Sequence, residues 1–358
     1  MAYTTIDDPS AYFKVQLYTG NGTAIGSGGN AITFNDTDTD MQPDMVWIKS
    51  RSTGEKHMLF DAVRGVTKAI KPSGNDAEAT NTEFLTAFGS DGFTVGSNDK
   101  VNDNTVTFVA WCWKANGAGA TNEAGSINTT KTSANTTSGF SISTFTGNAS
   151  AGATIGHGLG AVPHWFMNKN LADAGNWGVY HHKNTAAPET DHLHLDTNAA
   201  TADDADFWND TAPTSTLITL GTHGSINGSG EAMVNFSWTE IQGFSKFGSF
   251  VGNGDNNGPF LYCGFKPAWF MSKRTDAAAS WNIWNNKSNP HNVADALQYA
   301  DGTDAEASSA SYSIDFLSNG IKMRGYRADT NTNGATHVWM AFAESPFCNS
   351  SGVPNNAR

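Results

Sequence analysis

A short pattern of residues occurs three times along this chain, and any fold of the protein has to accommodate three copies of it. In each copy a proline is followed by large apolar residues at the third to fifth positions and by a lysine six residues after the proline. The copies read Pro43-Asp-Met-Val-Trp-Ile-Lys49, Pro163-His-Trp-Phe-Met-Asn-Lys169 and Pro267-Ala-Trp-Phe-Met-Ser-Lys273. The lysines are 120 and 104 residues apart, a spacing that indicates a repeated domain and not a turn of a solenoid.

Other features keep the same order around this pattern. Upstream, an aromatic residue and one further residue precede a Gly-Asn pair, in Tyr18-Thr-Gly20-Asn21, Phe145-Thr-Gly147-Asn148 and Phe250-Val-Gly252-Asn253. Downstream, a turn pair separates apolar stretches, at Asp91-Gly92, His223-Gly224 and Asn319-Gly320. Pairs such as Asp-Gly and Asn-Gly are typical of two-residue hairpins, because both central positions of a type I′ turn need a positive φ.

Each copy ends in a stretch in which every second residue is large and apolar. These residues are Val109, Trp111 and Trp113 in the first copy, Val234, Phe236 and Trp238 in the second, and Met340 and Phe342 in the third. A period of two places alternate side chains of a β-strand on one face, so we expect each set to lie on a buried side of a sheet.

Six or more short strands in about 100 residues are typical of a sandwich or jelly roll. Charged residues make up only 15% of the chain, while aromatic residues reach 11% and there are 37 glycines, a balance that suits strands and turns better than helical bundles. The sequence therefore predicts an all-β protein of three tandem β-sandwich or jelly-roll-like domains of about 100 residues each.

The repeats set the expected domain boundaries. We expect a first domain with its N-terminal segment over residues 1–115, a second over 140–242 and a third over 243–347, followed by a polar tail over 348–358. The stretch 116–139 is rich in Gly, Ala, Thr and Asn and has little to bury, so it is predicted to be a linker.

Charge and composition exclude several classes of protein. A net charge of −13 repels phosphate backbones, so we expect no nucleic-acid partner. The longest apolar runs are far shorter than the roughly 20 residues of a membrane helix, and no signal peptide is visible at the start of the sequence. The three cysteines, Cys112, Cys263 and Cys348, are far apart and odd in number, which predicts reduced thiols in a protein that folds in a cytosol.

Three further stretches of the chain are distinctive. They are the opening Met-Ala-Tyr-Thr-Thr-Ile-Asp-Asp-Pro-Ser-Ala-Tyr-Phe, the strand Phe-Val-Ala-Trp-Cys-Trp-Lys114, and the end from Trp-Met-Ala-Phe-Ala-Glu-Ser-Pro-Phe347 through Gly-Val-Pro-Asn-Asn-Ala-Arg358. Together they resemble structural proteins of tailed phages from marine bacteria and cyanobacteria. Such proteins are tail-fibre-like or otherwise virion-associated and carry repeated β-sandwich domains, some of them lectin-like. The resemblance implies a virion protein that is assembled in the host cytoplasm with other virion proteins as partners.

Two aromatic pairs are the candidates for ligand binding. The eighth and eleventh residues after the repeated lysine are Trp177 and Tyr180 in the second copy and Trp281 and Trp284 in the third. A spacing of three on a regular strand points the two members of a pair to opposite faces, so one member should be buried and the other at least partly exposed. An exposed aromatic ring can stack on a sugar or fill a subunit interface. The alternative is that a loop or a bulge buries both.

Two segments are candidate metal sites. On an extended strand, His192, His194 and Asp196 would share one face, although a polar strand face is the simpler interpretation. Asp36, Asp38 and Asp40 alternate as calcium-loop carboxylates can, but the glycine and the distal glutamate of an EF-hand are absent. We therefore expect no cofactor, with calcium as the open alternative.

No catalytic motif is visible. The glutamates are scattered and none recurs at one site in all three copies, and no Gly-x-Ser-x-Gly, P-loop or His-Glu-x-x-His sequence occurs. The first hypothesis is thus a non-enzymatic tail fibre or spike component that recognises host-surface glycans. The alternatives are a capsid decoration protein and, from another class, a β-sandwich polysaccharide hydrolase. A fibre predicts a homotrimer, because it must match a symmetric tail and its edge strands need covering.

Overall fold

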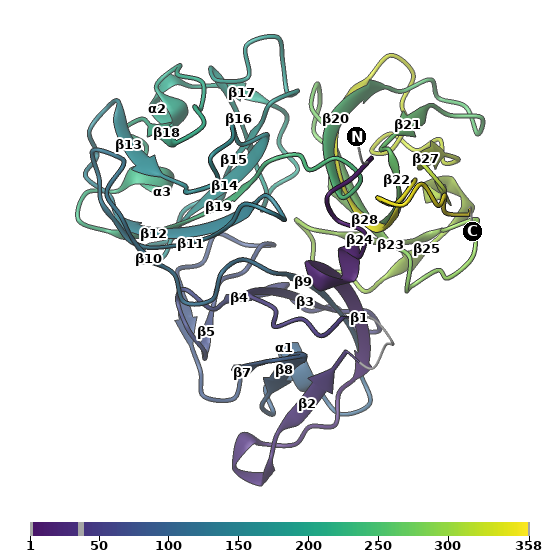
Figure 1. Ribbon diagram of the computed structural model, residues 1–358, viewed down its shortest axis with the longest axis horizontal. Coiled ribbons are helices and arrows are strands. Elements are labelled where there is room, and N and C mark those ends of the chain that lie inside the picture. The colour runs from purple at the N-terminus through teal and green to yellow at the C-terminus, as the bar shows by residue number, and fades with distance from the viewer. Residues whose placement is uncertain (1–2, 35–38, 357–358) are drawn as a thin grey trace.

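The computed structural model describes residues 3–34 and 39–356, and it shows an all-β protein of three lobes arranged around a common centre (Figure 1). The first lobe contains β1 to β9, the second β10 to β19 and the third β20 to β28. Neighbouring strands of every sheet pair in the antiparallel sense, so the predicted all-β class is confirmed. Among the described residues, no helix is long and apolar enough to cross a bilayer.

Each lobe has one large sheet. In the first lobe it has the order β1 (Phe13–Thr19), β9 (Thr107–Trp113), β3 (Met45–Ser50) and β4 (Met58–Asp61). In the second it has the order β10 (Ala120–Asn122), β11 (Thr129–Asn135), β12 (Phe140–Thr146), β19 (Ala232–Trp238), β14 (Trp165–Asn170), β15 (Gly178–His181), β16 (Asp191–His194) and β17 (Ala202–Asp203). In the third it has the order β20 (Ser245–Val251), β28 (Thr336–Pro346), β22 (Phe265–Arg274), β23 (Trp281–Asn285), β24 (Ala296–Tyr299) and β25 (Ala307–Ser308).

The four strands that the sequence pattern marks take the same order in every lobe. The first strand pairs with the last, the last with the proline-led strand, and the proline-led strand with the one that follows it. The register also repeats, since Phe13 lies opposite Trp113, Phe140 opposite Trp238, and Ser245 opposite Phe342. The sequence repeat is therefore a repeat of topology.

A smaller sheet or hairpin completes each lobe. These are β2 (Asn30–Thr33), β8 (Gly92–Val95) and β7 (Leu85–Gly89) in the first lobe, with the extra pair β5 (Lys68–Ala69) and β6 (Ala79–Thr80); β13 (Ala153–Gly156) and β18 (Leu217–Leu220) in the second; and β21 (Phe260–Tyr262), β27 (Gly320–Met323) and β26 (Ile314–Leu317) in the third. The helices are short: α1 (Asp99–Asn102), α2 (Ala205–Trp208), α3 (Gly224–Asn227) and three single 3₁₀ turns at Pro9–Ala11, Ile25–Ser27 and Ala310–Tyr312.

The central strands of the large sheets are buried on both faces. In the first lobe, Phe108 and Cys112 on one face of β9 pack against the small sheet, in a cluster that belongs to this lobe. Trp111 and Trp113 on the other face join a core that runs through all three lobes. At its centre the Trp113 ring lies 5.7 Å from Trp269 of the third lobe and 6.3 Å from Trp238 of the second. The alternating residues are thus buried as expected, but in a core that the three copies share.

The Gly-Asn pair ties the first strand of each lobe to a loop far along the chain. The Asn21 backbone N–H donates to the Asn102 side-chain oxygen at 2.9 Å, and the equivalent bonds join Asn148 to Asn227 at 2.9 Å and Asn253 to Asn331 at 3.0 Å. Asn102, Asn227 and Asn331 are all fully buried. The glycine is required because a Cβ at Gly147 would lie 2.3 Å from the Gly228 carbonyl oxygen. In each lobe the buried asparagine side chain therefore holds the end of the first strand against the loop that precedes the last strand.

The repeated lysines are buried where the lobes meet. Lys49 donates from Nζ to the Thr303 carbonyl of the third lobe at 3.2 Å, Lys169 to the Asn75 carbonyl of the first at 3.2 Å, and Lys273 to the Asn198 carbonyl of the second at 3.4 Å. All three side chains have no exposed surface, and burial lowers the pKa of each to about 8. The lobes are therefore connected in a closed ring.

Two expectations are corrected by the strand positions. Residues 116–139 are not a linker, because β10 and β11 lie within them and extend the second sheet beyond β12. Main-chain pairing, which needs no apolar side chains, holds these strands. His223-Gly224 is not a hairpin turn either, since His223 caps the N-terminus of α3 by accepting the Ser225 N–H.

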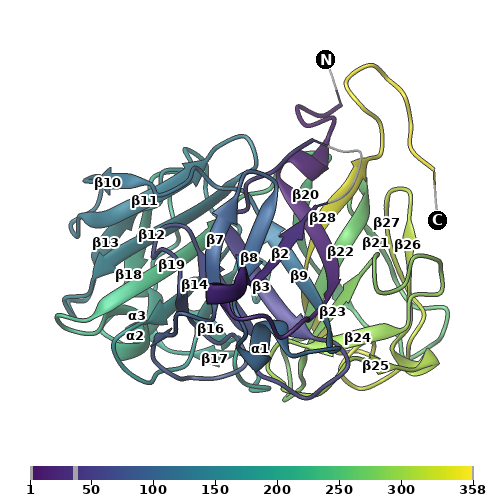
Figure 2. The ribbon, with the colours of Figure 1, turned by 90° about the horizontal axis from the view of Figure 1, so that it is seen from below.

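The segments that lead to the two ends of the chain lie close together on the third lobe (Figure 2). The Thr4 hydroxyl donates to the Gln242 carbonyl at 2.8 Å, and the Ser350 N–H donates to the Asp7 carboxylate at 2.6 Å. The N-terminal segment thus crosses from the first lobe to the third.

Candidate functional site

The predicted aromatic ligands are buried. Trp177, Trp281 and Trp284 have no exposed surface and Tyr180 is 4% exposed, so the expectation that one member of each pair is exposed was wrong. The members of a pair do point to opposite faces, but both faces are covered. Trp177 and Trp281 donate from Nε1 across lobe junctions, to the Lys71 carbonyl at 3.0 Å and the His194 carbonyl at 2.8 Å. Tyr180 stacks on Phe166 inside the second lobe, and Trp284 donates to the Tyr312 carbonyl.

The predicted metal ligands have other partners. His192 stacks on Phe207, and burial lowers its pKa to about 4. The His194 ring bonds the Trp177 carbonyl at 3.2 Å, and the Asp196 carboxylate accepts the Trp177 N–H at 3.0 Å. Burial raises the pKa of Asp196 to about 6.

The acidic run gives no further support for a metal site. Asp40 is exposed, while Asp36 and Asp38 lie outside the described residues. Among residues 3–34 and 39–356, no group of three or more His, Cys, Asp or Glu side chains could hold a metal ion.

Grooves lie instead at the junctions between the lobes. At each junction the turn after β4, β15 or β23, the strand that follows the proline-led strand, faces the first repeated strand of the next lobe, which is β12, β20 or β1. The turn residues that correspond by strand register are Ala62 and Val63 in the first lobe, His182 and Lys183 in the second, and Asn286 and Lys287 in the third. The lobe repeat therefore creates three comparable grooves with different side chains.

The groove between the second and third lobes has a volume of about 570 Å³ and carries exposed aromatic rings. Phe260 and Tyr262, both on β21, are 46% and 52% exposed. Lys183 lines the groove from the second lobe and Lys246 from the third. The groove thus combines two aromatic faces with two ammonium groups.

One carboxylate holds the polar side of this groove together. Glu240 accepts the Phe247 N–H at 2.9 Å through Oε1, and its Oε2 lies 3.7 Å from the Lys246 ammonium. His182 bonds the Phe247 carbonyl at 3.0 Å, and burial lowers its pKa to about 4, so the imidazole is neutral near pH 7. The buried Trp339 Nε1 has no partner among the described residues, which leaves a hydrogen-bond donor at the base of the groove.

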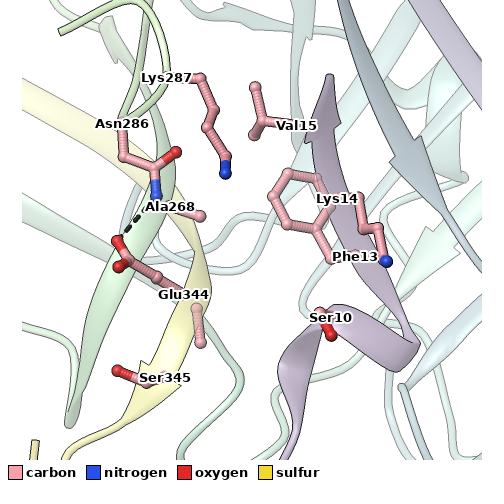
Figure 3. A pocket seen from close by; sticks show the side chains of 10 residues that line it. Ser10, Phe13, Lys14, Val15, Ala268, Asn286, Lys287, Glu344 and Ser345 are labelled. Carbon is pink, nitrogen blue, oxygen red and sulfur yellow. Dashed lines mark hydrogen bonds between the residues drawn. The ribbon is translucent and has the colours of Figure 1, made fainter. Parts of the chain in front are cut away.

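The groove between the third and first lobes is smaller, about 280 Å³ (Figure 3). Glu344 accepts a hydrogen bond from Asn286 Nδ2 at 2.7 Å and lies 3.2 Å from the Lys266 ammonium. Phe13 and Val15 form the opposite wall. The Lys287 ammonium points into the space between the two walls (Figure 3).

The groove between the first and second lobes lacks this charge pattern. Arg64 is held by Asp61 at 2.5 Å and by Glu78 at 2.8 Å, and its side chain is 2% exposed. Val63 occupies the position of Lys183 and Lys287. Arg64 is thus neutralised by fixed ion pairs and Lys68 lies 3.8 Å from Glu78, while the Lys131 ammonium lies 3.5 Å from the Val63 carbonyl oxygen.

The sequence held a signal for the two charged grooves that motif reasoning missed. Lys183 and Lys287 both follow the repeated lysine by 14 residues, and Glu240 and Glu344 follow it by 71. These charges recur in two copies only, so a search for residues common to all three copies passed over them. Phe260 and Tyr262 gave no signal, because exposure of an aromatic residue depends on which strands cover it.

The comparisons with known proteins support a family assignment and no more. No curated protein matches the sequence. One family model, described as a domain of unknown function (DUF7483), matches residues 8–346. Because this match spans all three lobes, the chain belongs to the DUF7483 family.

Proposed function

We propose that the protein is a non-enzymatic structural component of a phage virion and that it recognises host-surface glycans through the groove between the second and third lobes. The observation that carries the glycan part is the exposure of Phe260 and Tyr262 beside Lys183, Lys246 and Glu240. Isolated exposed apolar residues are ordinary on protein surfaces, but two aromatic rings on one short strand beside a groove favour a binding site.

Sugar rings suit this combination of groups. The apolar C–H face of a pyranose can pack on an aromatic ring, while its hydroxyl groups exchange hydrogen bonds with charged side chains at the edge. The unpartnered donor at Trp339 Nε1 offers one more bond to a sugar oxygen. Glu240 is already bonded to Phe247 and placed near Lys246, which favours orienting a ligand over proton transfer.

The virion part of the proposal is supported by the resemblance of three segments to phage structural proteins. Other virion proteins are then the partners, and the virion is the location. A homotrimer stays our prediction for a fibre or spike, and calcium stays the open alternative for the acidic run.

One observation favours the alternative of a capsid decoration protein. The three lobes lie around one approximate threefold axis, so a single chain already has the shape that fits a threefold position of a capsid lattice (Figure 1). Light scattering, together with cosedimentation, distinguishes the two hypotheses. A stable trimer supports a tail fibre or spike, and a monomer that cosediments with empty capsids supports a capsid decoration protein.

The glycan proposal is tested by binding to immobilised lipopolysaccharides and capsular polysaccharides from marine bacteria, measured by biolayer interferometry. Because each aromatic contact contributes about 1 kcal/mol beyond its buried area, we expect Tyr262→Ala to weaken binding about fivefold and the double variant with Phe260→Ala more than tenfold. Tyr326→Ala, which removes a 56% exposed ring that does not line this groove, is the matched control and should bind as the wild type does. Equal binding by Tyr262→Ala and wild type, or no binding to any polysaccharide, would contradict the proposal.

A further inference from the structure

We propose that the groove between the third and first lobes is a second sugar-binding site and that it selects a sugar that carries a carboxylate. This inference rests on the proposed glycan binding and adds the chemical class of ligand and a second location. The two grooves share no lining residue, so each can be tested without changing the other.

The first observation is a buried acceptor without a donor. Asn286 is 2% exposed, and its Nδ2 group is bonded to Glu344. Its Oδ1 atom has no hydrogen-bond partner among the described residues. Leaving a buried carbonyl oxygen unpaired is unfavourable, so a ligand hydroxyl that donates to this atom would supply the missing hydrogen bond. Figure 3 shows the oxygen directed toward the space beside Lys287.

The second observation is the charge of the groove. Lys287 is exposed, and no described acidic side chain lies within ion-pair distance of its ammonium. Glu344 is bonded to Asn286 and paired with Lys266 at 3.2 Å, so its charge is compensated. The Lys14 side chain points away from the groove, and its ammonium lies 4.0 Å from Asp91 and over the Phe34 ring. The cation available to a ligand is therefore Lys287, which favours an anionic group.

The third observation comes from the repeat itself. Counted from the aligned strands, Lys287 and Glu344 occupy the same repeat positions as Lys183 and Glu240 in the groove between the second and third lobes. The same pair of charges thus stands at two junctions, in grooves whose walls otherwise differ. A shared ligand chemistry accounts for this placement.

The size of the groove limits the ligand. A volume of about 280 Å³ is at the lower end for small-molecule sites, which suits one or two sugar rings. A hydroxylated ring with a carboxylate offers a donor to Asn286 Oδ1 and an anion to Lys287, while Phe13 and Val15 give an apolar wall. A uronic acid is the simplest such compound.

The test compares glucuronate with glucose, its neutral counterpart, by saturation-transfer NMR and by isothermal titration calorimetry on the full chain. We expect glucuronate to bind and glucose to bind at least tenfold more weakly. Lys287→Gln should weaken glucuronate binding about tenfold, as expected for loss of a charge-assisted hydrogen bond. Raising the salt concentration should weaken binding to the wild type more than to the variant.

Lys183→Gln, at the equivalent position of the other groove, separates the two sites, and Lys100→Gln, which changes a lysine outside both grooves, is the matched control and should bind as the wild type does. If glucuronate binding is lost in Lys183→Gln and kept in Lys287→Gln, the second site does not exist, although glycan recognition by the first groove stands. Equal affinity for glucose and glucuronate, or binding of neither at millimolar concentration, also overturns the inference. Failure of glycan recognition itself is read separately, from the polysaccharide assay with Tyr262→Ala.

Discussion

Replacement of Lys169 by methionine should change how the stability of this protein depends on pH. The lysine is fully buried between the first and second lobes, where Nζ donates to the carbonyl oxygens of Asn75 at 3.2 Å, Asn170 at 2.9 Å and Gly175 at 2.9 Å. Desolvation lowers its pKa to about 8 from the usual 10.5. Methionine has a similar length and no charge, so it keeps the packing and removes the titration.

The direction in which stability changes with pH follows from proton binding to Lys169. Between pH 8 and 10.5 the unfolded chain holds a proton on Lys169 that the folded chain has released, so the stability of the wild type rises with pH in this window. A difference of 2.5 pKa units corresponds to about 3 kcal/mol of unfavourable charge burial at pH 7, of which about 2 kcal/mol is relieved by pH 9.5. At pH 7 the variant avoids this unfavourable burial of a charge. It also leaves three carbonyl oxygens without a hydrogen-bond donor, which destabilises it by a comparable amount. Its stability at pH 7 should therefore be within about 2 kcal/mol of the wild type.

The measurement is urea unfolding followed by tryptophan fluorescence at pH 7, 8, 9 and 9.5 at constant ionic strength. The free energy of unfolding of Lys169→Met, relative to the wild type, should fall by about 2 kcal/mol between pH 7 and 9.5. Buried cysteines and tyrosines also titrate in alkali, but they are common to both proteins and cancel in the difference. Lys183→Met changes an exposed lysine and should show no such trend. A difference that stays constant over this range would show that the Lys169 amine keeps its ordinary pKa, and the sealed lobe junction would be refuted.

Two further changes test other parts of the structure. Gly147→Ala should destabilise the protein by about 2 kcal/mol or more, because the new Cβ would lie 2.3 Å from the Gly228 carbonyl oxygen, whereas Gly224→Ala, with no atom within 4 Å, should leave the melting temperature nearly unchanged. Equal melting temperatures of the two variants would contradict the close approach at the Gly-Asn pair. Asp196→Asn should stabilise the protein at pH 7 by up to about 3 kcal/mol, because burial raises the pKa of this carboxyl to about 6 and the folded state then favours the uncharged form. The gain should nearly vanish at pH 4, where wild-type Asp196 is protonated in the fold; a gain that persists at pH 4 would contradict the raised pKa.

Local patterns in the sequence were sufficient to predict the main strands and the order in which they follow one another along the chain. The repeat predicts strands at two places in each copy, and the structure has strands there: the proline-led β3, β14 and β22, and the alternating β9, β19 and β28. These could be predicted because a proline at the start of a strand and a period of two are local properties of the sequence. The Gly-Asn pair was also visible, but its partners Asn102, Asn227 and Asn331 were not. They lie about 80 residues further along the chain, and nothing local marks them as buried.

The relation between the lobes could not be predicted from a local pattern. Exposure of Trp177 or Trp281 depends on whether another lobe covers that face of the sheet, and here a neighbouring carbonyl binds each indole N–H. Residues 116–139 were misjudged for a different reason: their polar composition suggests a linker, but their main chain pairs with the adjacent strand β12. The first error concerns a contact between segments that are distant in the sequence, and the second concerns a local pairing that few apolar side chains mark.

The first lobe provides an internal control for the function of the charged grooves. Its junction with the second lobe uses Ala62 and Val63 where the other junctions use His182 and Lys183 or Asn286 and Lys287. The Ala62 backbone N–H still bonds to the Asp44 carbonyl at 2.9 Å, as the His182 N–H bonds to His164 and the Asn286 N–H to Ala268. The backbone geometry of this turn is therefore kept without a lysine at this position. Since closing the lobes does not require Lys183 or Lys287, and since an exposed cation without a partner adds little to stability, their recurrence in two grooves is better explained by an anionic ligand than by folding.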